Sequence, residues 1–118
     1  KTHCINSTSE TYHGDQWVRA EVLVLGDSVV KHYANGQEVL VYMKPQVGGG
    51  NVDGQEIVFG SPGQLLTGGT ISLQSESHPV EFKNIEILNL EGCMDPKASN
   101  YRSYYIKSKP SDCKYNKK

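Results

Sequence analysis

Apolar and polar residues alternate in the first part of the chain with the two-residue period of β-strands. Over residues 16–25 one face is apolar and the other mixes apolar, aromatic and charged side chains. Residues 28–34 and 37–44 continue the alternation on either side of Asn35-Gly36, a dipeptide typical of two-residue hairpin turns. The pattern predicts a three-stranded antiparallel meander.

Further strands are expected after a long glycine-rich loop. The loop covers residues 46–69, with one short strand expected at 56–59. Strands are then predicted at 70–76 and 80–90, with a corner between them at 77–79. Because the apolar phase shifts within 80–90, the pattern also predicts a bulge near Lys83-Asn84. No segment has the apolar stripe of an amphipathic helix, so we predict an all-β antiparallel fold of the β-sandwich or jelly-roll type.

Two predicted turns set which side chains share a face. Two-residue turns at 26–27 and 35–36 would place His32 opposite Glu21 on one side and opposite Val39 on the other. That face would hold Trp17, Arg19, Glu21, Leu23, Val30, His32, Val39 and Val41. Aromatic rings beside charged groups are typical of sugar-binding grooves, although a solvent face with cross-strand ion pairs gives the same pattern.

The length, net charge and apolar runs of the chain limit the kinds of protein that it can be. The 118 residues suffice for one domain with a short appendage. A net charge of −1 gives no electrostatic reason to expect nucleic acid as a partner. No apolar run approaches the ~20 residues of a membrane-spanning helix.

The three cysteines are Cys4, Cys93 and Cys113. The last two flank a segment rich in Lys and Tyr, in which a disulfide would close a loop of about 20 residues and stabilise it by roughly 3 kcal/mol. We favour this disulfide over three free thiols, and it implies an oxidising compartment. Cys4 would then pair with a partner elsewhere.

Four separate segments resemble one family when they are taken in order. They are Tyr12-His13-Gly14-Asp15-Gln16-Trp17, Val30-Lys31-His32-Tyr33-Ala34-Asn35-Gly36, Ile71-Ser72-Leu73-Gln74 followed by His78, and Phe82-Lys83-Asn84-Ile85-Glu86-Ile87. Together they resemble the 3-keto-disaccharide hydrolase family, sugar-active domains with a concanavalin-like jelly roll related to laminarinase-type glycoside hydrolases. The resemblance covers roughly residues 10–90. It implies an oligosaccharide or polysaccharide partner.

The resemblance also implies a chemistry. In a glycoside oxidised at C3, the ketone acidifies the C2 proton, so a base can start elimination of the glycosidic group, and water adds afterwards. Carried over by motif position, the catalytic candidates are His32, His78 and Gln74. Trp17, Arg19, Glu21 and Asn35 are the predicted sugar contacts, with Glu21 added by the strand register alone. A divalent metal such as Ca²⁺ fits concanavalin-like folds, but no ligand set can be named.

Two departures from the family matter. Its N-terminal portion has no counterpart in this sequence, so we expect the chain to be a fragment, or its sandwich to be completed by another copy or an upstream polypeptide. Lys83 stands where the family often has Arg, which keeps the charge but loses the two-pronged hydrogen bonding.

The segment after residue 91 resembles a Cys-bracketed module found at the C-termini of secreted bacterial proteins. We therefore expect a sugar-active β-sandwich at 1–91, a basic tail at 92–118, and an extracytoplasmic location, periplasmic or secreted. Three functions remain open: cleavage of 3-keto-glycosides, non-catalytic carbohydrate binding, and a structural or adhesive role at a surface.

Overall fold

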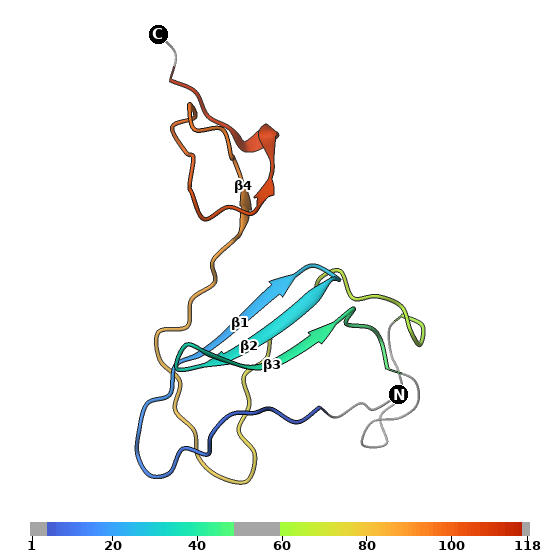
Figure 1. Ribbon diagram of the computed structural model, residues 1–118, viewed down its shortest axis with the longest axis vertical. Helices are drawn as coiled ribbons and strands as arrows, with labels where there is room; N and C mark the ends of the chain where they lie inside the picture. The colour runs from blue at the N-terminus through green and yellow to red at the C-terminus, as the bar shows by residue number, and fades with distance from the viewer. Residues whose placement is uncertain (1–4, 49–59, 117–118) are drawn as a thin grey trace. The chain divides into compact units, whose positions relative to one another are not determined.

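The computed structural model describes residues 5–48 and 60–116. The chain forms two compact units, residues 1–73 and 74–118. Figure 1 shows the strands of the first unit and the C-terminal segment of the second. Cys4 and the short strand predicted at 56–59 lie outside the described residues.

The first unit contains the predicted meander. Strands β1 (Ala20–Leu25), β2 (Val29–Ala34) and β3 (Gln37–Met43) form an antiparallel sheet in the order β1-β2-β3 (Figure 1). Each strand contains two Val, and β2 and β3 each add a Tyr, residues that suit a pleated, half-buried surface. The first strand begins later than the alternation predicted, at Ala20.

The turns of the sheet set its register. Leu25 pairs with Val29, so the first turn has the three residues 26–28 rather than two. The second turn has the two predicted residues, and Asn35 and Gly36 both adopt positive φ, 48° and 82°, as a type I′ hairpin requires.

The predicted alignment of His32 is wrong on both sides. His32 pairs with Val22 of β1 and with Leu40 of β3, not with Glu21 and Val39. The third turn residue shifts β1 by one position. A bulge between His32 and Tyr33 leaves Val39 as an extra residue in β3. Because a one-residue slip moves a side chain to the other face, Glu21 and His32 lie on opposite faces of the sheet.

Two segments border β3 and the end of the sheet. The backbone N–H of Thr8 donates to the carbonyl of Val39 at 2.8 Å, which lays the N-terminal segment along β3. Beyond β3, Val47 exchanges backbone hydrogen bonds with Gln64 and Gly63, at 2.9 and 2.8 Å. Val47 is buried, as are Val30 and Ala34 of β2.

The second unit begins with an extended segment that is not a strand. No strand is present at 70–76 or at 80–90, so these two predicted strands are wrong. A strand requires a hydrogen-bonded neighbour along its length. Backbone hydrogen bonds join this segment to a neighbour at its end, where the carbonyl of Leu90 accepts from the N–H groups of Ile106 and Lys107. The predicted corner is present as a bend at Ser77 and His78. Asn84 adopts a φ of 52°, at the point where the apolar phase shifts.

The rest of the second unit is a disulfide-closed tail, residues 91–116. It contains a parallel pair of short strands, β4 (Glu91–Gly92) and β5 (Lys107–Ser108), and a single 3-10 turn, η1 (Pro110–Asp112). The predicted disulfide between Cys93 and Cys113 is confirmed, with Cα atoms 4.9 Å apart. Cys93 and Ala98 are buried.

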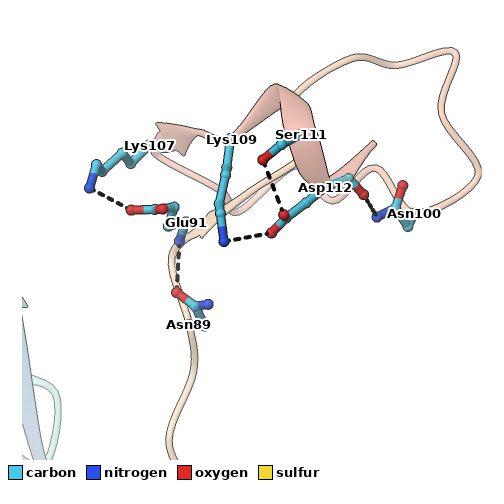
Figure 2. A network of polar contacts seen from close by, with 7 residues as sticks. All are labelled: Asn89, Glu91, Asn100, Lys107, Lys109, Ser111 and Asp112. Atoms are coloured by element: carbon cyan, nitrogen blue, oxygen red, sulfur yellow. Dashed lines mark hydrogen bonds and ion pairs between the residues drawn. The ribbon is translucent and has the colours of Figure 1, made fainter. Parts of the chain in front are cut away.

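Side chains tie the strands of the tail together (Figure 2). Lys107 on β5 pairs with Glu91 on β4, with Nζ and Oε2 2.5 Å apart. Lys109 pairs with Asp112 across η1 at 3.2 Å, and Asn100 donates to the carbonyl of Asp112 at 2.8 Å.

The predicted fold class is confirmed in its main features. The described residues are almost entirely non-helical, their main sheet is antiparallel, and the C-terminal region carries one disulfide. Among these residues no helix is long and apolar enough to cross a membrane.

Candidate functional site

His32 occupies the middle of the central strand β2. Its cross-strand neighbours are Val22 and Leu40, and Val30 and Ala34 share its face because side chains two positions apart in a strand point the same way. The sheet therefore places the imidazole among apolar cross-strand and same-face neighbours. Val22 remains 42% exposed beside it.

The His32 ring contacts one aromatic neighbour. Its centroid lies 5.7 Å from that of Tyr42 on β3, with the ring planes tilted by 33°. Tyr42 pairs with Val30, so it shares the His32 face. Sequence reasoning missed Tyr42, because only the bulge at Val39 brings Leu40 and Tyr42 into phase with His32.

Nε2 of His32 has an unmet hydrogen-bonding capacity. This atom is buried and has no hydrogen-bond partner among the described residues. A buried polar atom without a partner costs about 1–3 kcal/mol. A ligand or another polypeptide that reached this atom and supplied the missing hydrogen bond would remove the cost.

The opposite face carries charged pairs. Arg19 and Glu21 form an ion pair at 2.8 Å, and Lys31 and Glu38 form a second at 2.7 Å. The hydrogen bond to the Glu38 carboxylate raises the pKa of Lys31. All four side chains are at least one-third exposed, so these pairs contribute little stability. They fit the solvent-face alternative of the sequence pattern.

Asn35 forms hydrogen bonds with the backbone of Arg19 at the end of the sheet. Its side-chain oxygen accepts a hydrogen bond from the backbone N–H of Arg19 at 3.0 Å, and its own N–H donates to the carbonyl of Arg19 at 2.8 Å. These bonds extend the pairing of β1 and β2 by one step. Trp17, just before them, is 55% exposed.

The remaining candidates belong to the second unit. Gln74 and His78 are both exposed, and His78 lies in the bend that follows the positive φ of 67° at Ser77. Their roles at a sugar stay a prediction. Within residues 5–48 and 60–116, no group of three or more His, Cys, Asp or Glu side chains is placed to hold a metal ion.

Comparison with known proteins identifies the family. The family model for the 3-keto-alpha-glucoside-1,2-lyase-like domain matches residues 1–88, which is most of the chain. No curated protein and no solved structure matches. The match confirms the resemblance of the sequence segments and supports a carbohydrate-active domain with a sugar partner. The chain belongs to the 3-keto-alpha-glucoside-1,2-lyase-like family.

Proposed function

We propose that this chain cleaves glycosides whose sugar carries a ketone at C3, with Nε2 of His32 in contact with the substrate. Two observations support the proposal. The family model covers residues 1–88, and the one buried, unpartnered side-chain atom of the described residues is a nitrogen able to exchange a proton.

The reaction requires a base near the C2 proton. The base removes that proton, the electron pair delocalises onto the ketone oxygen, and the enolate expels the glycosidic oxygen from C1. An acid protonates the leaving oxygen, and water then adds across the C1–C2 double bond. A neutral imidazole accepts a proton at the nitrogen that carries none, which is the role proposed for Nε2 of His32.

The apolar surroundings of His32 suit this role. Val22, Leu40 and the Tyr42 ring limit competing water at the imidazole. The Tyr42 ring also offers a surface against the C–H face of a sugar.

The test follows release of 3-ketoglucose from a 3-keto-disaccharide by the complete chain. We expect His32→Gln to lower kcat/KM by about 100-fold or more, the usual contribution of a general base. In D₂O, the wild-type chain should also place deuterium at C2 of unreacted substrate, and His32→Gln should not. His78→Ala and Gln74→Ala test the resemblance-based candidates separately.

Two matched variants control for the loss of a side chain. His13→Gln removes an exposed histidine of the N-terminal segment, and Glu21→Gln removes a carboxylate on the opposite face of the sheet. Both should retain wild-type turnover. Turnover by folded His32→Gln equal to that of His13→Gln would remove His32 from the mechanism.

A non-catalytic carbohydrate-binding module is the second candidate. It is favoured by the composition of the His32 face, where the strand residues paired around His32 include no carboxylate and Tyr42 is the one further proton donor. Saturable binding of the 3-keto-disaccharide without product or deuterium exchange would establish this alternative.

We also propose an extracytoplasmic location and a covered sheet. The Cys93–Cys113 disulfide supports the location, since such bonds persist in oxidising compartments. Val22 and Val24, 42% and 48% exposed on the His32 face, support a partial covering layer from a second copy or an upstream polypeptide, which would have to leave the approach to His32 open. Light scattering after size-exclusion chromatography distinguishes a dimer from a monomer.

A further inference from the structure

The disulfide-closed tail has a corner where its first and last stretches lie side by side. The backbone N–H and the hydroxyl of Ser99 both donate to the carbonyl of Lys114, at 2.8 and 3.0 Å. The N–H of Lys114 donates to the side-chain oxygen of Asn100 at 2.9 Å. The Tyr115 hydroxyl donates to Oδ2 of Asp95 at 2.7 Å. Residues 95–100 and 114–115 are thus joined by four hydrogen bonds.

Tyr115 is held in place yet remains open to solvent. Its residue is 59% exposed, although its hydroxyl is fixed by Asp95. An exposed aromatic ring with a restrained orientation loses little conformational entropy when it binds. Such a ring also presents a flat apolar surface, which suits the C–H face of a sugar ring.

Two lysines adjoin Tyr115 along the backbone of this corner. Lys97 follows Asp95 closely, and its N–H donates to the Asp95 carboxylate at 2.9 Å; Lys114 precedes Tyr115 in the chain. Both side chains are exposed, and neither has a carboxylate within ion-pair distance in the part of the tail that the structure describes.

The acidic groups of the tail are already engaged. Glu91 pairs with Lys107, Asp112 pairs with Lys109, and Asp95 accepts from Tyr115 and from the backbone of Lys97. The ammonium groups of Lys97 and Lys114 are therefore available to an anion from outside.

We propose that this corner, formed by Lys97, Lys114 and Tyr115, binds an acidic polysaccharide. The Tyr115 ring stacks on one sugar, and the two ammonium groups pair with carboxylates of the same or neighbouring sugars. This second carbohydrate site is independent of His32, and it would hold the chain on an anionic glycan.

The test is affinity electrophoresis of the complete chain in gels with and without polygalacturonate. We expect polygalacturonate to retard the wild-type chain and a neutral β-glucan not to do so. Tyr115→Ala should weaken binding about five- to tenfold. Lys97→Gln and Lys114→Gln should each weaken it about two- to fivefold, with a smaller effect at high salt.

Matched variants test whether binding depends on the corner itself rather than on the net charge or on the number of tyrosines. Lys44→Gln removes one exposed positive charge from the first unit, and Tyr104→Ala removes an exposed tyrosine from the same tail. Both should bind as the wild type does. His32→Gln should also bind normally, so failure of the proposed catalytic site leaves this result unchanged.

Three outcomes would overturn the proposal. They are absence of retardation by polygalacturonate at low salt, equal weakening by Lys44→Gln and Lys114→Gln, and equal retardation by the neutral glucan. Tyr115→Phe retains the ring but loses the bond to Asp95, so it should weaken binding less than Tyr115→Ala. Circular dichroism and free-thiol titration verify that each variant is folded and disulfide-bonded.

Discussion

The ring of Tyr105 lies against Gly92, so close that a Cβ atom at position 92 would overlap three of the ring carbons. Gly92 belongs to β4 and directly precedes the buried Cys93. Because Gly92 has no side chain, the Tyr105 ring can pack directly against the backbone of β4 in the disulfide-closed tail.

Gly92→Ala should destabilise the tail by about 1–3 kcal/mol, since an added methyl group in a packed contact forces its neighbours to move. Tryptic cleavage within residues 91–116, followed by mass spectrometry, measures the loss of protection. Gly68→Ala is the control, because a Cβ there meets nothing within 4 Å and the backbone φ is ordinary. Equal protection of both variants would contradict the packing argument.

Asn35 contributes a backbone conformation and a hydrogen bond, and two substitutions separate them. Asn35→Gly keeps the positive φ of 48° and loses only the bond to the N–H of Arg19, about 1 kcal/mol at most. Asn35→Ala loses the bond and adds about 1–2 kcal/mol of left-handed backbone strain. Urea denaturation should rank the variants as wild type, Asn35→Gly, Asn35→Ala. A different order would mean that the turn is not of type I′ in solution.

Reduction of the Cys93–Cys113 disulfide should lower the stability of the tail by about 3 kcal/mol, because its loop spans 20 positions of sequence. The tail has little core to replace the disulfide: Cys93 and Ala98 are its buried apolar residues. We expect faster tryptic cleavage after reduction, and the same pattern in the Cys93→Ser/Cys113→Ser double variant. Unchanged cleavage in both samples would count against the disulfide as the main constraint.

The Asp95–Tyr115 hydrogen bond should confine the stability of the tail corner to a pH window. The bond lowers the pKa of Asp95 from 3.8 and raises the pKa of Tyr115 from 10.0. The stability that ionised Asp95 contributes to the corner is therefore present above about pH 4 and is lost as pH falls through the lowered pKa of Asp95. The Tyr115 contribution is present below about pH 10 and is lost as pH rises through its raised pKa.

Ultraviolet titration of the tyrosines measures this effect. The wild-type chain should show a phenol with a raised pKa, and Asp95→Asn should lower that pKa again. Because Tyr115 is exposed and Asp95 is only half-buried, the associated change in stability should be small. A Tyr115→Phe variant in which the raised phenol pKa persists would show that another tyrosine is responsible.

The sequence predicted the elements whose pairing is local. The Asn35-Gly36 turn joins neighbouring strands, so a dipeptide and a few alternating residues suffice to define β2 and β3. The Cys93–Cys113 disulfide was likewise predicted from the composition of a short segment. The side-chain contacts of Lys31, Tyr42 and Tyr115 depend on partners that composition does not indicate.

Register and long-range pairing were not predicted correctly. One additional residue in the first turn and one bulged residue, Val39, changed the neighbours of His32 from Glu21 and Val39 to Val22 and Leu40. Alternation at 70–76 and 80–90 is correct as a sequence pattern, yet it forms no strand. Alternation is a property of a single strand. It does not show whether a second strand is present to form hydrogen bonds with it.

The Asn35-Gly36 turn has a further consequence, which is chemical and develops with time. In an Asn-Gly dipeptide the unhindered glycine nitrogen can attack the asparagine side-chain carbonyl, release ammonia and form a succinimide, which water opens to aspartate or isoaspartate. Aspartate would add a negative charge beside Arg19, whereas isoaspartate would insert a methylene group into the backbone that joins β2 to β3. Deamidation of Asn35 would therefore alter the same turn that aligns β2 with β3.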